Sequence, residues 1–216
     1  MIYVDIHTHK SVDSNCVAVR NLTFPEAEEL FASTVDGWFS VGFHPWHAGE
    51  FSAERMKQLT TWVADPRFIA LGECGLDKNS KASFEVQVDV FEQQIALSEK
   101  AQKPMIIHCV GFFNELLALK KKFKPLQLWI IHGFRSKPEL AFQLLKAGCA
   151  LSFGEHFNAD SVRVTPLDRL FVETDESQMS ITEIYHFISG IKNCQVHQLN
   201  AGSTVIQAKN YTENRK

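Results

Sequence analysis

The sequence predicts an α/β protein of the TIM-type (β/α)8 barrel class. Short apolar runs alternate with longer segments of helical period, which is typical of parallel strands joined by helices. Histidines or carboxylates follow several of the runs, as in barrels whose active sites lie where the strands end. The eight expected strands are residues 2–6, 16–20, 38–43, 67–73, 104–107, 127–131, 149–153 and 169–173. A doubly wound open sheet has the same alternation, so periodicity alone leaves both folds open.

The expected helices are marked by apolar stripes and by their first residues. Capping boxes are expected to begin helices at Thr23, Ser136 and Ser180. The run Lys120–Lys122 is interpreted as a solvated helix end. The stretch from His7 to Asn15 is too short for the usual helical crossover, so the first helix is expected to be lost. The stripes are Phe84, Val88, Phe91 and Ile95; Phe112, Leu116, Leu119 and Phe123; and Ile181, Ile184, Ile188 and Ile191.

Length and composition limit the possible classes of protein. A chain of 216 residues, 45% hydrophobic, fits one compact domain over 1–216, with 211–216 expected to fray. The net charge of -3 gives no bulk attraction to nucleic acid and argues against a coating role. Five scattered cysteines without a C-x-x-C pair indicate reduced thiols and a cytoplasmic location. We expect no membrane association, and no obligate protein partner can be inferred.

Five expected strands end in side chains that bind metal ions. Any one of them could be a capping or core residue, but the carboxyl ends of barrel strands share one face. Period-2 alternation also puts His7 and His9 on the same side of their strand. Together these residues could hold two divalent ions. The motifs are Asp5-Ile-His7-Thr-His9, Gly72-Glu73-Cys-Gly-Leu-Asp77, Met105-Ile-Ile-His108, Leu128-Trp-Ile-Ile-His132 and Leu170-Phe-Val-Glu173-Thr-Asp175.

The order of these motifs resembles that of the TatD family of metal-dependent deoxyribonucleases, which are amidohydrolase-like metal barrels. The chain contains D-x-H-T-H, G-x-H-P at 42–45, G-E-x-G-L-D, P-x-x-I-H-C and E-T-D in the family's order. The resemblance implies that the working metal is Mg or Mn, while the histidine-rich ligand set also suits Zn. It implies that Glu73 bridges two ions, one held with His7, His9 and Asp175 and the other with His108 and His132.

Residues around these ligands are expected to orient them or to contact the substrate. Asp5 and Glu173 are interpreted as carboxylates that orient the ligating histidines. His44 is expected at the rim or behind the ligands. The family usually has an arginine near the position of Val110, and Arg135 is the expected replacement for holding a phosphate. Glu176-Ser177 also replaces the residues that usually follow E-T-D. The metal ligands therefore look complete while the substrate rim looks remodelled.

These residues predict a two-metal hydrolase in which Asp175 takes the proton of a metal-activated water. The resemblance implies DNA, or a small phosphodiester, as substrate, with exonucleolytic cleavage from a 3′ end. One alternative is hydrolysis of a small phosphoester, an amide or a lactone at the same site. Another is a non-catalytic, metal-stabilised binding protein. A PHP-type phosphoesterase ranks lower, because its T-D-H-containing strand is absent.

Overall fold

The computed structural model describes residues 3–10 and 16–206, and the chain falls into two compact units. The first unit comprises residues 1–20 and 132–216, and the second comprises residues 21–131. The expected fraying of 211–216, and most of the connection in which the first helix was expected to be lost, lie outside the described residues. A single domain over the whole chain stays a prediction.

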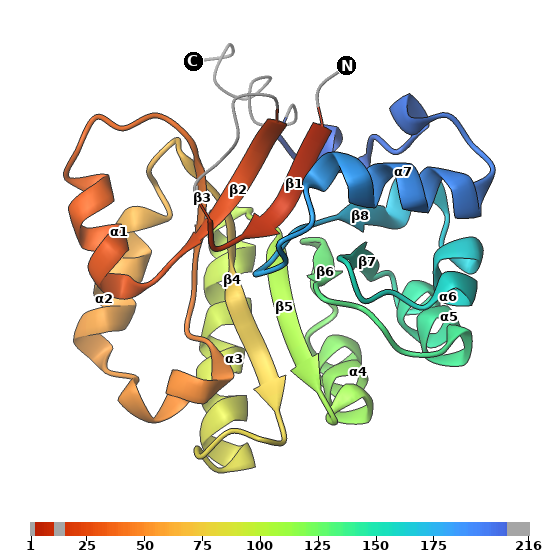
Figure 1. Ribbon diagram of the computed structural model, residues 1–216. Coiled ribbons are helices and arrows are strands. Elements are labelled where there is room, and N and C mark those ends of the chain that lie inside the picture. The colour runs from red at the N-terminus through yellow and green to blue at the C-terminus, as the bar shows by residue number, and fades with distance from the viewer. Residues whose placement is uncertain (1–2, 11–15, 207–216) are drawn as a thin grey trace. The chain divides into compact units, whose positions relative to one another are not determined.

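The second unit has four parallel strands, β3 to β6, that neighbour one another in sequence order. Figure 1 shows β4 and β5 side by side, with α3 packed along β4. This alternation of strand and helix is the one that the sequence predicts. The elements are α1 (Phe24–Phe31), β3 (Trp38–Val41), η1 (Pro45–Glu50), α2 (Ala53–Trp62), β4 (Phe68–Asp77), α3 (Phe84–Ala101), β5 (Met105–Val110), α4 (Phe113–Phe123) and β6 (Trp129–Ile131).

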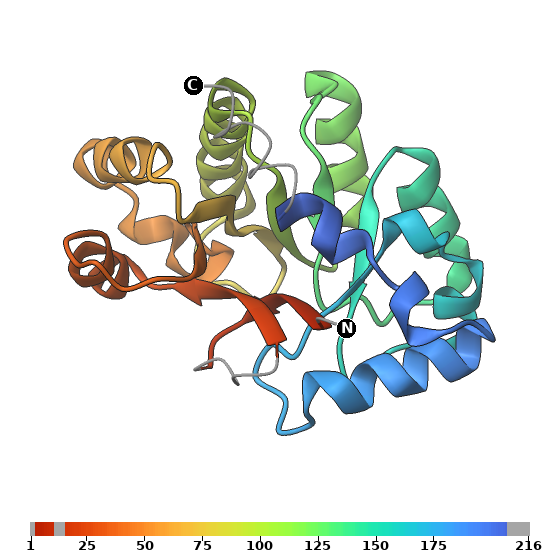
Figure 2. The same cartoon turned by 90° about the horizontal axis from the view of Figure 1, so that it is seen from above.

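Helices α1 and α2 are fixed by a cap and by aromatic packing. Thr23 begins α1 in a capping box with Glu26, which confirms the prediction. The rings of Phe24 and Phe31 lie 5.4 and 5.8 Å, centroid to centroid, from the ring of Trp62 in α2. Figure 2 shows the two helices next to each other. Because aromatic pairs at such distances stabilise beyond their buried area, these contacts hold the two helices together.

Strand β4 is longer than predicted, because glycines let it lie very close to β5. It was expected to end at residue 73, but it continues to Asp77 with every residue buried. At Gly75, where φ is +139°, an added Cβ would lie 2.0 Å from the carbonyl oxygen of His108. Only glycine fits such a position. The other predicted strands agree with the observed ones to within a few residues at each end.

The prediction for the lysine run at the end of α4 was wrong in part. Lys121 and Lys122 are exposed, as expected, but Lys120 is buried. Its ammonium lies 4.6 Å from the ring centroid of Trp129, which is itself fully buried. Lys120 lies one helical turn after Leu116 and so shares its inward face. The long aliphatic stem packs there while the charge is stabilised by the indole.

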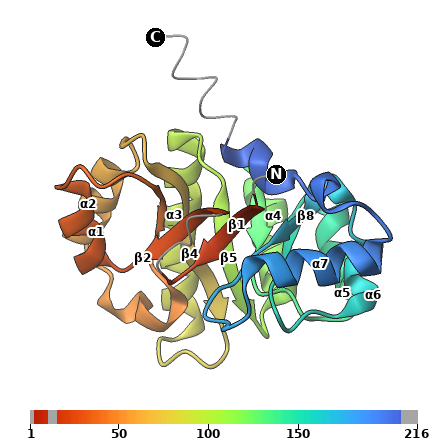
Figure 3. The same ribbon diagram turned by 45° about the horizontal axis from the view of Figure 1, so that its top comes forward.

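The first unit contains strands β1 and β2, which pair in parallel, and β7 and β8, which also pair in parallel. A bridge between Thr8 and Asp175 joins the end of β1 to the segment after β8. Figure 3 shows α5, α6 and α7 beside one another. The elements are β1 (Tyr3–Thr8), β2 (Cys16–Leu22, divided by the boundary between the units), α5 (Pro138–Lys146), β7 (Ala150–Phe153), α6 (Ala159–Val164), η2 (Leu167–Arg169), β8 (Leu170–Val172), α7 (Ile181–Lys192) and η3 (Val196–Gln198).

Helix α7 is attached directly to the strand that carries the first histidine motif. Ser180 begins the helix in the predicted capping box, and Ile184 and Ile188 of the predicted stripe are buried. The hydroxyl of Tyr185 donates a hydrogen bond to the carbonyl oxygen of Val4 in β1 at 2.9 Å. Burial raises the pKa of Tyr185, so this hydroxyl stays protonated and remains a donor.

The predicted capping box at Ser136 was wrong. Helix α5 begins one residue later, with Lys137 in the capping position and no side-chain hydrogen bond to the helix. Pro138 occupies the first turn, where its missing N–H costs nothing and its fixed φ suits a helix. The carbonyl oxygen of Ser136 instead accepts a hydrogen bond from the hydroxyl of Ser161 at 2.6 Å. The segment is therefore held by α6 rather than by its own cap.

All five cysteines are free thiols, as predicted. Over residues 3–10 and 16–206, no helix is both long enough and apolar enough to span a bilayer.

Candidate metal-binding sites

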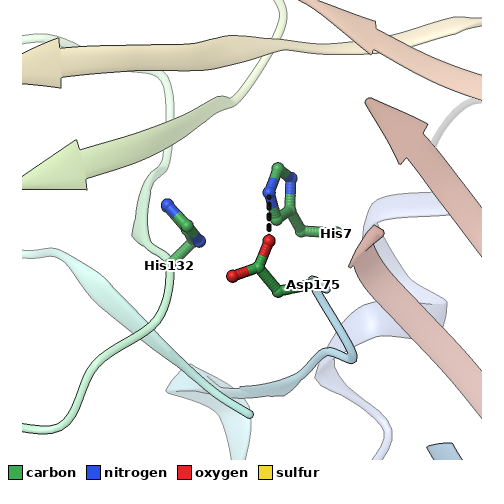
Figure 4. Close-up of side chains that lie close together, drawn as sticks. All are labelled: His7, His132 and Asp175. Atoms are coloured by element: carbon green, nitrogen blue, oxygen red, sulfur yellow. Dashed lines mark ion pairs between the residues drawn. The ribbon is translucent and has the colours of Figure 1, made fainter. Parts of the chain in front are cut away.

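Three potential ligands of the first unit meet where strands end. His7 is the fifth residue of β1, His132 follows β6, and Asp175 follows β8. Figure 4 shows the side chains turned toward one another. His7 Nε2 lies 3.6 Å from Asp175 Oδ1, and one ligand atom from each residue falls within 4.8 Å of the others. Such a group has the size and the donor atoms of a divalent-metal site.

His9 lies beside this group and is less buried. Its Nε2 is 3.6 Å from the same Oδ1 of Asp175, and its side chain is 34% exposed. The ring stands edge-on to that of His7, with centroids 5.0 Å apart. Period-2 alternation therefore brings the two histidines to one side of the strand, as the sequence predicts.

Asp5 holds the ends of the two strands together rather than facing the ligands directly. Its carboxylate accepts hydrogen bonds from the Thr174 hydroxyl at 2.6 Å and from the Thr174 and His7 backbone N–H groups at 3.0 and 3.3 Å. Burial raises the pKa of Asp5 to about 7, although the hydrogen bonds from Thr174 lower it. A cation nearby would favour the ionised carboxylate. Asp5 thus fixes the backbone of His7 and of Thr174, the residue that precedes Asp175.

Glu173 supplies the observation that tests whether a metal suits this site. The side chain is fully buried, and Oε1 accepts a 2.6 Å hydrogen bond from the N–H of Gly133 and lies 3.4 Å from His132 Nδ1. Within the part of the chain that the structure describes, Oε2 has no hydrogen-bond partner. A buried carboxylate is costly unless positive charge compensates it. The residues present therefore fit a bound cation.

A second group of potential ligands lies in the second unit. His44, Glu73 and His108 offer ligand atoms within 4.8 Å of one another. Glu73 Oε1 is 2.8 Å from His108 Nδ1 and 3.2 Å from His44 Nε2. Ligands bonded to one ion at about 2.0–2.2 Å lie roughly this far apart. His44 is thus next to Glu73, whereas the sequence suggested only a place at the rim or behind the ligands.

Asp77 joins this second group to an exposed tryptophan. Its Oδ2 lies 2.9 Å from His108 Nε2 and accepts a 2.7 Å hydrogen bond from the indole N–H of Trp46. Burial opposes ionisation of Asp77, but hydrogen bonds from Asn79, His108 and Trp46 outweigh it and lower its pKa. The ionised carboxylate can therefore fix the ring of His108, as carboxylates commonly do for ligating histidines.

Sequence reasoning missed three amides that hold the backbone of this group. Asn21 accepts a 2.8 Å hydrogen bond from the N–H of Glu73, and Gln87 accepts one of the same length from the N–H of Asp77. Gln94 accepts from the N–H of Phe43 at 2.7 Å and donates to the carbonyl oxygen of Phe43 at 3.2 Å. Gln87 and Gln94 were not part of the predicted apolar stripe, but they are buried on the same inward face of α3 as Phe91 and Ile95. Polar residues on an inward stripe were the available signal.

Replacing Gln94 with alanine is expected to destabilise the protein by about 2–4 kcal/mol, because it leaves both polar groups of the Phe43 backbone buried and without partners. Phe43 precedes His44, so metal affinity should fall as well. Gln93→Ala is the matched control, since this neighbouring glutamine is exposed. Urea unfolding measures both changes. Equal midpoints for the two variants would show that Gln94 does not hold this loop.

The structure brings the predicted ligands together within each unit. The two ligand sets implied by the resemblance each combine residues of both units, and their assembly stays a prediction. Arg135, the expected phosphate-binding residue, is exposed after β6.

Comparison with known proteins identifies the family. The model of the TatD-related DNase family matches residues 5–199, which includes every predicted ligand. The chain belongs to this family. A TatD homologue from Escherichia coli has a similar structure, with a TM-score of 0.79 at 17% identity over 97% of this chain and 96% of that one. A TatD-family hydrolase from Entamoeba histolytica gives a TM-score of 0.76 at 14% identity, over 94% and 97% of the chains. These matches confirm the predicted TIM-type barrel class.

Curated members of the TatD family are also similar in sequence. A 3′-5′ ssDNA/RNA exonuclease from Erwinia amylovora is 32% identical over 149 residues, which are 64% of this chain and 57% of the relative. A 3′-5′ RNA nuclease from Homo sapiens is 33% identical over 168 residues, 72% of this chain and 22% of the relative. A metal-dependent hydrolase from Bacillus subtilis is 32% identical over 71% of this chain and 64% of its own. The chain thus matches less than two thirds of the length of these relatives.

Proposed function

We propose that this TatD-family protein is a metal-dependent hydrolase that cleaves phosphodiester bonds of nucleic acid. The observation that carries the proposal is the presence, in each unit, of a group of histidines and carboxylates close enough to bind one ion. The buried Oε2 of Glu173, which needs a compensating cation, supports it. The names of the nuclease relatives from Erwinia amylovora and Homo sapiens supply the substrate class.

The proposed ligands are the six residues that the motifs single out, with Glu73 expected to bridge. They are His7, His9, Glu73, His108, His132 and Asp175. Two divalent ions, Mg, Mn or Zn, would lower the pKa of a water molecule toward neutrality and neutralise charge on the phosphate. Two histidines of the proposed set have a carboxylate behind them that can fix the ring: Asp77 for His108, and Glu173 for His132.

Asp175 is the proposed proton acceptor. Its side chain is 41% exposed, so it can reach a water molecule as well as the neighbouring histidines. Its backbone is fixed, because its N–H donates to the carbonyl oxygen of His7 at 3.0 Å and its carbonyl oxygen accepts from the N–H of His9. A carboxylate held in this way can take the proton as the attacking oxygen bonds to phosphorus.

The proposed substrate is a single strand of DNA or RNA, cleaved from the 3′ end. The net charge of -3 gives no general attraction to polyanions, so binding has to come from local groups. Arg135 is the proposed phosphate contact, since a guanidinium can hold a phosphate by two hydrogen bonds. The free thiols support a reducing compartment, and we place the protein in the cytoplasm.

Elemental analysis and a substrate panel test this function together. We expect the protein to bind two divalent ions and to shorten single-stranded oligonucleotides from the 3′ end, with activity lost in chelator. His108→Ala should remove one of the two ions, because it breaks the group around Glu73. A stoichiometry near one that His108→Ala leaves unchanged would eliminate the second ion.

The panel also separates the alternatives. If the protein hydrolysed a small phosphoester, an amide or a lactone but no oligonucleotide, that small molecule would replace nucleic acid as the proposed substrate class. A full metal complement without turnover of any substrate would make the protein a metal-stabilised binding protein.

A further inference from the structure

Trp46 is an exposed aromatic residue whose position the proposed chemistry does not explain. Among the described residues, six large hydrophobic side chains are exposed, and Trp46, at 59%, is one of them. Of these six residues, Trp46 is the one that hydrogen-bonds to the second group of potential ligands and to its neighbour Asp77. Its backbone N–H donates to His44, and its indole N–H donates to Asp77. A single exposed apolar side chain is ordinary on a protein surface, so the position of this indole beside potential metal ligands, and not its exposure alone, calls for an explanation.

The indole is fixed at its buried end. The indole N–H donates to Asp77, which is only 1% exposed, and the backbone N–H of Trp46 donates to His44 Nδ1 at 3.1 Å. Pro45 precedes it in the first turn of η1 and restricts the backbone there. The ring also stands edge-on to His44, with centroids 5.0 Å apart. An aromatic side chain held in this way loses little further freedom when a ligand packs on it.

Its neighbours say what kind of ligand would reach it. The ring centroid of Trp46 lies 6.3 Å from that of His108, so a ligand that touches the indole also lies beside the proposed metal ligands. A nucleotide bound for cleavage has a flat base next to its phosphate. Bases stack on aromatic rings with little dependence on sequence, which suits a nuclease that removes successive nucleotides.

We infer that Trp46 is the stacking surface for a nucleobase of the single-stranded substrate, next to the phosphate that is cleaved. This inference rests on the proposed nuclease function. In a chain with a net negative charge, stacking supplies affinity that charge does not. The stacking residue lies in the segment His44-Pro45-Trp46-His47. The inference adds no residue to the proposed set of metal ligands.

Paired substrates and variants test the inference. Steady-state kinetics would compare normal oligonucleotides with oligonucleotides that carry an abasic nucleotide at successive positions from the 3′ end. For the wild-type protein, one abasic position should raise KM about tenfold, the usual scale for one stacked base. Trp46→Leu should raise KM about as much on the normal substrate and be insensitive to that abasic position. Anisotropy of a labelled phosphorothioate oligonucleotide should show the same pattern in binding, without turnover.

Two further variants separate stacking from other effects. Trp46→Phe keeps an aromatic ring but loses the N–H that donates a hydrogen bond to Asp77. Its KM should therefore retain most of its dependence on the presence of the base. Leu126→Ala removes an exposed apolar side chain, 90% exposed, that is not part of the site, and should leave KM unchanged.

Three outcomes would overturn the inference. One is a normal KM in Trp46→Leu, and another is the full abasic effect persisting in that variant. The third is equal loss in Trp46→Phe and Trp46→Leu, which would mean that Trp46 acts only through its hydrogen bond to Asp77. Absence of oligonucleotide cleavage by the wild-type protein would instead remove the proposed function, and this inference with it.

Discussion

Replacing Asp175 with asparagine is expected to lower kcat by about 10²-fold or more while the fold and most of the bound metal remain. Asparagine keeps an oxygen that can bind a metal ion, but it cannot take a proton. The backbone at this position is left-handed, with φ of 51°, and asparagine is one of the few residues other than glycine that adopts this conformation readily. The backbone hydrogen bonds to His7 and His9 do not depend on the side chain.

Kinetics on an oligonucleotide, with metal content and circular dichroism measured on the same samples, check this result. Asp168→Asn is a suitable control, because it makes the same chemical change away from the proposed ligands. The side chain of Asp168, in η2, is 78% exposed. A kcat close to that of the wild-type protein would place the proton acceptor elsewhere, with Glu73 the next candidate. If the variant lost its bound metal as well as its kcat, the main role of Asp175 would be to bind the metal and not to accept the proton.

Gly75→Ala is expected to destabilise the protein by about 3 kcal/mol or more, a large fraction of the roughly 5–15 kcal/mol by which a typical domain is stable. The added Cβ would lie 2.0 Å from the backbone oxygen of His108, and the φ of +139° is itself unfavourable for any other residue. Gly75 and His108 are partners in the register of β4 and β5. Relief of the clash requires the strands to separate, so metal affinity should fall in whatever protein still folds.

Gly190→Ala is the matched control, and its effect should have the opposite sign. This glycine lies inside α7, where nothing is within 4 Å of an added Cβ. Alanine favours a helix over glycine by about 0.5–1 kcal/mol, so the variant should unfold at a higher denaturant concentration than the wild-type protein. If Gly75→Ala unfolded at the same midpoint as the wild-type protein, the close approach of β4 to β5 would be incorrect.

Most of the fold could be predicted because it depends on patterns that are local in sequence. Apolar runs identified the strands, and Thr23 and Ser180 identified two helix starts. The start of α5 could not be found in this way, because Ser136 satisfies the pattern while its backbone is bound by a distant hydroxyl. Lys120 was misread for a similar reason, since its burial depends on the ring of Trp129.

The candidate sites were predictable only in part, for a related reason. His132 directly follows β6 and His108 lies two residues before the end of β5, so their positions relative to apolar runs single them out. The supporting amides of Asn21, Gln87 and Gln94 act on backbone groups far away in the sequence. The amino-acid sequence does not indicate which backbone group a side-chain amide will bind. The same holds for Trp46, because its partner Asp77 lies 31 residues further along the chain, at the end of β4.

The first unit is built from two segments that are far apart in the sequence, and this affects how it forms during synthesis of the chain. This unit joins residues 1–20 to residues 132–216, so His7 has to wait for Asp175 to be synthesised. At roughly 5–20 residues per second, that wait lasts about 10–30 s. The second unit, by contrast, is one continuous stretch, and its contacts can form as soon as residue 131 has left the ribosome. Until then the two histidines of the first motif lack the carboxylate beside which both lie in the folded unit. The order of synthesis therefore favours binding of the metal ion late, after Asp175 has been made.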